Sequence, residues 1–201
     1  MKRTLLTVLP TLGLAIGILS FSVLQASAIE YDFLDSSNKV LPTPFVPKIN
    51  YELPDSSIIK PDSVFWPLKA GIDKTWLVIE TEPQYEAEQL LYYADERLVY
   101  SLDLFKQGKS DLGLSVLTKA EKYLEEAFVA QQIAQAEGKD TTLVLQKISM
   151  SSLKHSEVID YIVTICPEEV QAFVVKTSDY SKRLYNETKT QFYAQGITPF
   201  E

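Results

Sequence analysis

The feature that most constrains the fold is a series of long segments in which apolar residues recur at three- and four-residue steps, separated by short links that contain Gly or Pro. This spacing places the apolar residues on one side of an α-helix. The interruptions fall near Gly108, Gly138 and Pro167. Long helices joined by short links must fold back on their neighbours to bury their apolar sides. The sequence therefore predicts an all-α, up-and-down antiparallel bundle of about four long helices.

Each of these predicted helices has a set of residues that we expect in the core. The helices are expected over residues 83–108, 110–138, 141–165 and 167–196. The residues expected to be buried are, in chain order, Leu90, Leu91, Ala94, Leu98, Leu102, Phe105, Val116, Leu117, Ala120, Leu124, Ala127, Phe128, Ala134, Val144 or Leu145, Ile148, Ile159, Ile162, Val170, Phe173, Val174, Leu184 and Phe192.

A shorter helix is predicted ahead of the bundle, beginning with Asp62 or Ser63 as its cap. Its apolar residues also follow helical spacing, and we expect them to be buried against the bundle. Trp66 and Trp76 are both predicted to lie in the core. The apolar side consists of Phe65, Leu68, Ile72, Trp76 and Ile79.

The first part of the chain predicts export. Lys2 and Arg3 precede an uncharged, apolar stretch that ends in Ala26-Ser27-Ala28, as in a signal peptide. We expect cleavage after Ala28, but the stretch 5–24 is long enough to span a bilayer, so an uncleaved anchor is the alternative. The predicted organisation is a signal peptide or signal anchor at 1–28, a Pro-rich linker at 29–61 that docks in part, and the bundle at 62–201.

Composition limits the partners. The chain has 27 acidic against 19 basic side chains and a formal net charge of −8. A surface of this sign repels the phosphate backbone, so no nucleic-acid partner is expected. Cys166 is the single cysteine, which rules out a disulfide within the chain.

Several short motifs from Pro61 onward occur together in one known family. They are Pro61-Asp62-Ser63, Trp66-Pro67-Leu68-Lys69, Ala94-Asp95-Glu96-Arg97-Leu98 and the turn Gly108-Lys109. With these motifs the stretch 61–128 resembles the bacterial family catalogued as domain of unknown function 5667. The resemblance implies an exported or membrane-anchored helical protein, in some members within anti-sigma-like regulatory contexts. It implies no activity.

No catalytic, metal-binding or cofactor-binding residues are predicted. A metal site in a helical bundle usually combines inward carboxylates with histidines at Glu-x-x-His spacing. His155 is the single histidine, and Ser152 stands three residues before it. We expect His155 to be an inward, hydrogen-bonded structural residue, with ligand contact as the alternative. Cys166 is expected to cap the last helix as an inert, partly buried thiol, with a disulfide-linked dimer as the alternative.

The remaining polar candidates also favour structural roles. Asp95, Glu96 and Arg97 are adjacent and therefore point to different sides of a helix, and Arg97 is expected to pair with a carboxylate on a neighbouring helix. Glu121 is expected on a solvated face together with Glu125 and Glu126. Most tyrosines are expected at the edges of the apolar sides, with their hydroxyls in water.

These patterns favour a non-catalytic protein that acts outside the cytoplasm, either secreted or held by its N-terminal segment. We predict a protein-interaction or structural module of the cell envelope, with an envelope protein or a cell-wall component as partner and with membrane contact through the N-terminal segment only. The alternative is a small-ligand carrier or sensor with a cavity between helices. No enzyme activity and no cofactor are expected.

Overall fold

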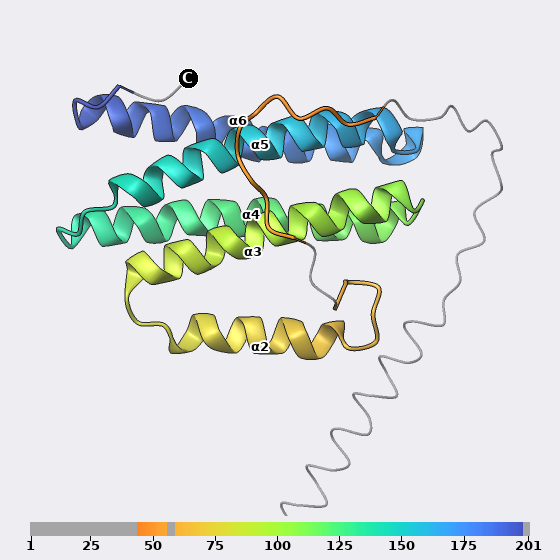
Figure 1. Ribbon diagram of the computed structural model, residues 1–201, viewed down its shortest axis with the longest axis horizontal. Coiled ribbons are helices and arrows are strands. Elements are labelled where there is room, and N and C mark those ends of the chain that lie inside the picture. Colours follow the sequence, from red (N-terminus) through yellow and green to blue (C-terminus); the bar gives the residue numbers. More distant parts are fainter. Residues whose placement is uncertain (1–43, 56–58, 199–201) are drawn as a thin grey trace, which may run out of the picture. The chain divides into compact units, whose positions relative to one another are not determined.

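The computed structural model describes residues 44–55 and 59–198, and within these ranges the regular secondary structure is entirely helical (Figure 1). The predicted all-α class is confirmed. The predicted signal or anchor at 1–28 lies outside the described residues. Within the described ranges, no helix combines the length and the apolar character that a membrane span requires. The helices are α2 (Trp66–Ile79), α3 (Pro83–Lys106), α4 (Ser110–Ala136), α5 (Thr142–Ile165) and α6 (Glu168–Ala194).

Two glycines end helices at the predicted links. Gly108 and Gly138 have φ angles of 78° and 83°, a left-handed conformation that other residues rarely adopt. After Gly108, the amide of Lys109 donates to the carbonyl of Leu104 at 2.9 Å, which closes the last turn of α3. The same pattern ends α4. The chain therefore reverses within a few residues, and α3 and α4 become antiparallel neighbours (Figure 1).

Helices α3 to α6 form the predicted antiparallel bundle. Helix α3 packs on α4 and α5, and α6 packs on α4 and α5, so each helix has a neighbour on two sides. The residues predicted for the core of α4 and α5 are buried, and so are most of those predicted for α3 and α6. Phe173 is the clearest exception, because its side chain is 60% exposed near the start of α6.

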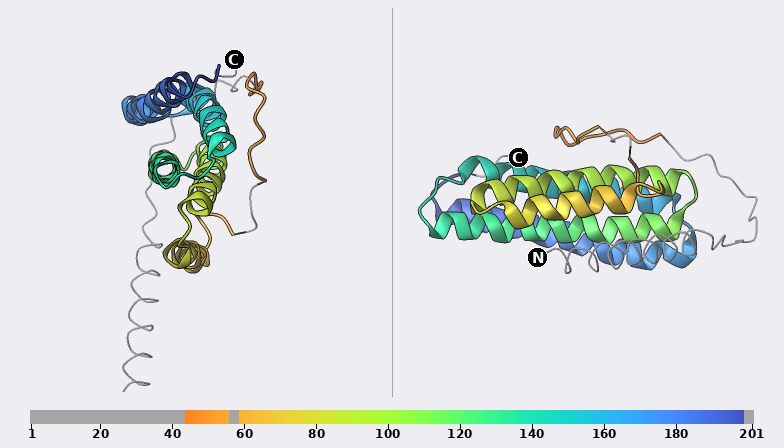
Figure 2. Two further views of the ribbon diagram at one scale, coloured as in Figure 1. Left: turned by 90° about the vertical axis from the view of Figure 1, so that its left-hand side faces the viewer. Right: turned by 90° about the horizontal axis from the view of Figure 1, so that it is seen from below.

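Residues 44–55, which we call the strap, cross the bundle in an extended conformation (Figures 1 and 2). The ring of Phe45 lies 5.1 Å from that of Tyr161 on α5. Backbone amides of the strap donate to the carboxylate of Glu157, and the ammonium of Lys154 donates to the carbonyl of Ile49 at 3.1 Å. The predicted partial docking of the Pro-rich segment is thus confirmed for this part.

The prediction for the shorter helix is wrong in its orientation. Helix α2 begins at Trp66 rather than at Asp62 or Ser63, and its apolar side faces away from the bundle. Trp76, predicted in the core, is 62% exposed, whereas Trp66 is half-buried against Tyr100. We name the exposed set the α2 stripe. It consists of Phe65, Leu68, Ile72, Trp76 and Ile79, with exposed fractions between 49% and 66%.

The physical reason lies in the charged residues of α2. Asp73 is buried and Lys69 is half-buried, and both find charged partners on α3. A buried charge without a partner is much more costly than an exposed apolar side chain. The helix therefore turns its charged side, with Trp66 and Leu77, toward α3, and the α2 stripe remains in solvent.

Candidate functional site

The centre of the bundle holds a row of three ionisable side chains. His155 on α5 is fully buried between Glu121 on α4 and Asp95 on α3. Its Nδ1 lies 2.6 Å from Oε1 of Glu121, and its Nε2 lies 3.1 Å from Oδ1 of Asp95. Both carboxylates are almost completely buried as well. The imidazole thus links three helices through one continuous polar contact.

The strap completes this row on its Asp95 side. The hydroxyl of Tyr51 donates to Oδ2 of Asp95 at 2.6 Å, and the hydroxyl of Ser151 donates to Oδ1 at 2.6 Å. Burial and the nearby Asp95 charge raise the pKa of the Tyr51 phenol, so it remains a donor. Asp95 therefore accepts from three groups, Tyr51 on the strap and Ser151 and His155 on α5.

The charge state of His155 follows from its neighbours. Burial on its own lowers the pKa of an imidazole, but the charge of Glu121 and the hydrogen bonds that the ring donates to both carboxylates outweigh it and raise the pKa of His155 to about 9. The ring is therefore protonated at neutral pH and donates from both nitrogens. The His155 cation thus lies between the carboxylates of Glu121 and Asp95, and this pairing offsets the cost of burying the three charges.

Stability is expected to depend on pH through this residue. Because the folded-state pKa of about 9 exceeds the ordinary value of 6.5, the stabilisation is complete below pH 6.5 and is lost as the pH rises through 9. The loss corresponds to about 3 kcal/mol of unfolding free energy. Urea unfolding at intervals from pH 6 to pH 9.5 measures it. A flat profile over this window would contradict the assignment, and since His155 is the single histidine, no other imidazole can produce the slope.

The polar partners of His155 in this row are side chains of the protein itself. The ring nitrogens of His155 point to two different carboxylates, so neither is directed at a hydroxyl nucleophile. The Ser151 hydroxyl is bonded to Asp95 instead. Within the described ranges, no set of three or more His, Cys, Asp and Glu side chains is arranged to hold a metal ion. The row acts as a structural clamp between α3, α4 and α5.

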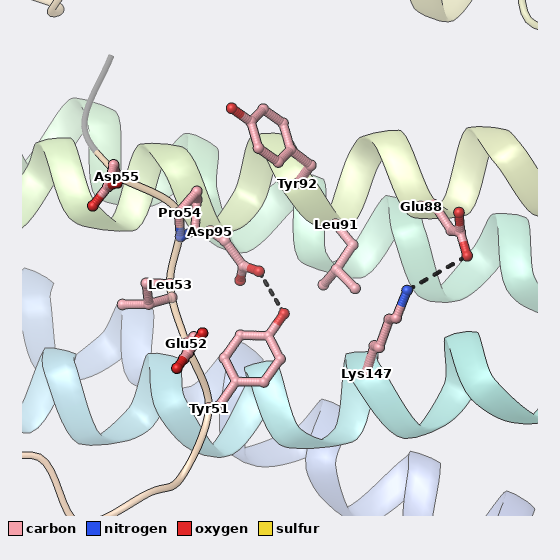
Figure 3. Close-up of a pocket in the computed structure, with 10 residues that line it drawn as sticks. All are labelled: Tyr51, Glu52, Leu53, Pro54, Asp55, Glu88, Leu91, Tyr92, Asp95 and Lys147. Atoms are coloured by element: carbon pink, nitrogen blue, oxygen red, sulfur yellow. Dashed lines mark hydrogen bonds and ion pairs between the residues drawn. The ribbon is translucent and has the colours of Figure 1, made fainter.

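A surface pocket of about 860 Å³ opens beside the strap (Figure 3). The strap forms one wall, and residues of α3 and α5 form the rest. The carboxylate of Asp95 lies at its inner side, bonded to Tyr51, and the pair Glu88–Lys147 spans its other end at 3.7 Å (Figure 3). The acidic lining residues are Glu52, Asp55, Glu88 and Asp95.

A second polar cluster attaches α2 to α3. The ammonium of Lys69 lies 2.7 Å from Glu96 Oε2 and 3.0 Å from Asp73 Oδ2. Glu96 also accepts a hydrogen bond of 2.8 Å from the hydroxyl of Tyr100. Each charge of the cluster thus has a partner of opposite sign, which allows Asp73 and Glu96 to be buried.

Arg97 extends this cluster into an aromatic box. Its guanidinium lies 4.4 Å from the ring centre of Tyr123, 5.3 Å from that of Tyr93 and 5.7 Å from that of Trp66. One nitrogen donates to the carbonyl of Tyr93, and another lies 3.5 Å from Asp73. A buried guanidinium among ring faces is stabilised by cation–π attraction as well as by the ion pair. The box joins α2, α3 and α4.

Several sequence predictions can be compared with these contacts. Asp95, Glu96 and Arg97 do point in different directions, and Arg97 does pair with a carboxylate of a neighbouring helix. His155 is inward and hydrogen-bonded, as predicted. The prediction that Glu121 faces solvent is wrong, because it is 1% exposed and bonded to His155.

The predictions for the tyrosines and for Cys166 agree with the structure only in part. Tyr93 and Tyr100 are buried, contrary to the expectation for most tyrosines, whereas Tyr85 and Tyr193 are exposed. Cys166 is half-buried, and burial raises the pKa of its thiol. It ends α5 rather than capping α6, where Pro167 stands at the cap position.

The docking of part of the Pro-rich segment was predicted from sequence, but the Tyr51 contact and the aromatic box were not. For Asp95 and Glu121 a signal was available. Asp95 lies four residues after Leu91 and three before Leu98, and Glu121 lies four after Leu117 and three before Leu124. Both therefore occupy core positions of their helices.

The chain was compared with known proteins and with protein-family models to find the family to which it belongs. A comparison with curated proteins and one with solved structures found no significant match. The family model described as domain of unknown function, DUF5667, matches residues 58–169. This range contains α2 to α5, both polar clusters and the start of α6, and it continues well beyond the stretch 61–128 that holds the sequence motifs. The match covers more than half of the chain, and the protein therefore belongs to the DUF5667 family.

Proposed function

We propose that this protein is a non-catalytic interaction module of the cell envelope, exported by its N-terminal segment, and that it binds another protein through the α2 stripe. The single observation that carries the proposal is the orientation of α2. Five large apolar side chains at helical spacing stand in solvent, four on α2 and Phe65 at its N-cap. Contiguous exposed apolar surface of this kind is typical of interaction sites.

The way in which α2 is attached to the bundle supports an interaction role for the exposed stripe. The polar side of α2 is fixed by the charges of Lys69 and Asp73 and by the aromatic box around Arg97. These contacts use buried, specific partners rather than general apolar packing. The helix is therefore held in the orientation that exposes the stripe, and a partner meets a preformed surface with little ordering cost.

The chemistry of the buried polar residues supports a non-catalytic role. His155, the residue best suited to general acid–base chemistry, is fully buried and has both nitrogens committed to carboxylates. The two carboxylates keep the His155 ring protonated and fix its orientation. The acidic surface supports a protein partner rather than a nucleic acid.

The substitution Trp76→Asp tests the proposal. It is expected to abolish association in the membrane and wall fractions, because it replaces the largest apolar side chain of the stripe by a charge. It should change the unfolding free energy by less than about 0.5 kcal/mol, since the side chain is largely exposed. Co-purification of the full chain, followed by native mass measurement, reads out association.

The matched control is Phe173→Asp, which makes the same kind of change at an exposed aromatic residue of α6. This variant should associate like the wild type. If the wild-type chain is recovered alone and monomeric, or if both variants lose association equally, the proposed role of the stripe is wrong.

The pocket beside the strap favours a second candidate, a small-ligand carrier or sensor. Its volume of about 860 Å³ lies within the range of ligand sites. Asp95 is already bonded to Tyr51, Ser151 and His155, but Glu52, Asp55 and Glu88, against the single Lys147, suit a cationic ligand rather than the apolar one that a cavity between helices would take. Calorimetric titration with spermidine, compared between the wild type and Glu88→Gln, separates this candidate from the first.

A further inference from the structure

The spacing of the residues in the α2 stripe is symmetric. Its residues follow one another at steps of three, four, four and three, so the series reads the same in both directions about Ile72. At 100° per residue the five positions fall within an arc of about 80°. A seam this narrow suits one facing helix. A helix that binds a lipid surface has a wider apolar face and a basic polar face.

From this symmetry we infer that the α2 stripe binds the α2 stripe of a second copy of this chain, with the two helices antiparallel and a two-fold axis at Ile72. The inference rests on the proposed interaction role of the stripe and names its partner. In this pairing Phe65 faces Ile79, Leu68 faces Trp76, and Ile72 faces its own copy. Such an interface is self-complementary, as a two-fold dimer requires.

The sizes of the side chains favour the antiparallel direction. Each aromatic residue of one copy, Phe65 or Trp76, meets an aliphatic residue of the other, so large and small side chains alternate along the seam. A parallel pair would set Trp76 against Trp76 and Phe65 against Phe65. The antiparallel pair also places the positive end of one helix dipole beside the negative end of the other.

The surroundings of Ile72 permit close approach. Gly71 has open space where a Cβ would stand, and the hydroxyl of Thr75 is already bonded to the carbonyl of Gly71 at 2.7 Å. The stripe itself contains no charged residue, so the pairing buries no unpaired charge. The charged residues of α2 lie elsewhere on the helix: Lys69 and Asp73 are engaged with α3, and Lys74 is exposed on the side away from the stripe.

The exposed surface is sufficient for a weak, specific dimer. Two aromatic and three aliphatic side chains, each about half exposed or more, present about 500 Å² per copy and about 1,000 Å² in the pair. This total is near the lower end of specific protein interfaces. The dimer is therefore expected to respond to protein concentration.

Disulfide cross-linking of the full chain tests this geometry. Helix axes about 8–10 Å apart bring the two facing Cα atoms at position 72 to about 4–6 Å, within disulfide range. In a Cys166→Ser background, Ile72→Cys is expected to give a product of twice the chain mass on mild oxidation. Lys74→Cys is the matched control, because it is exposed on the same helix but lies about 200° further round, and it should give none.

Two further variants fix the direction of the helices. In the antiparallel pair, residue 68 lies about 12 Å along the axis from residue 68 of the other copy, so Leu68→Cys alone should not cross-link. A mixture of Leu68→Cys and Trp76→Cys chains should, because these positions face each other. If Leu68→Cys links efficiently to itself, the antiparallel arrangement is overturned.

The outcome for Ile72→Cys separates this inference from the proposed function. A disulfide between position 72 and a different protein overturns the second copy as occupant and leaves the interaction role of the stripe standing. The absence of any adduct at position 72, together with normal association of the Trp76→Asp variant, overturns both.

Discussion

Replacing His155 by alanine is expected to lower the unfolding free energy by about 3–5 kcal/mol at pH 7. The substitution removes the one cation between Glu121 and Asp95 and leaves two carboxylates buried without a charged partner. It also opens a cavity where three helices meet. Urea denaturation at pH 7 measures the loss, and the same variant should lose the fall in stability between pH 6.5 and pH 9.

A matched control lies on the same pair of helices. Lys147 on α5 pairs with Glu88 on α3 at 3.7 Å, but both side chains are about half exposed. Lys147→Ala is therefore expected to cost less than about 1 kcal/mol. The double variant His155→Ala/Glu121→Gln should be more stable than His155→Ala, because it removes one of the uncompensated charges. A loss below about 1 kcal/mol for His155→Ala would show that His155 is not a cation between two buried carboxylates.

Replacing Arg97 by alanine is expected to lower the unfolding free energy by about 2–4 kcal/mol. The guanidinium contacts three aromatic rings and Asp73 while almost fully buried, so its removal leaves an unfilled space and weakens the attachment of α2. Trp66 borders that space and should become more exposed. A red shift of the tryptophan fluorescence, measured with denaturant unfolding, reports both effects.

Arg183 provides the control for this prediction. Its guanidinium lies 5.2 Å from the ring centre of Tyr180 and pairs with Glu125 and Glu187, but about half of its side chain is exposed. Arg183→Ala is therefore expected to cost less than about 1 kcal/mol. Arg97→Lys should recover little of the loss, since an ammonium cannot stack its plane on the rings. Equal losses at the two arginines would contradict the role of burial.

The sequence was a good guide to the bundle because the apolar spacing of α3, α4 and α5 reflects burial directly. Every residue predicted for the core of α4 is buried. The links were predictable as well, because Gly108 and Gly138 adopt backbone angles that other residues avoid. These features depend on local sequence, and no distant part of the chain is needed to interpret them.

The same reasoning failed for α2 because a helical period shows that one side is apolar but not which side packs inward. The answer depended on Glu96 and Arg97, which lie more than twenty residues further along the chain and supply the partners of Lys69 and Asp73. The burial of Glu121 likewise depends on His155, 34 residues away. Charge pairing between distant segments is not visible in a local pattern.

The strap has a mechanical consequence. Its backbone is bonded to Glu157 and Lys154 on α5, and its Tyr51 is bonded to Asp95 on α3, so it ties the α3–α4 hairpin to the α5–α6 hairpin. A pulling force applied to the chain ahead of residue 44 is therefore carried first by these bonds and is shared between the two hairpins. Helix α2 comes after the strap in the chain, so this force does not pass through it. Tension from the N-terminal side therefore reaches the bundle while the α2 stripe keeps its position.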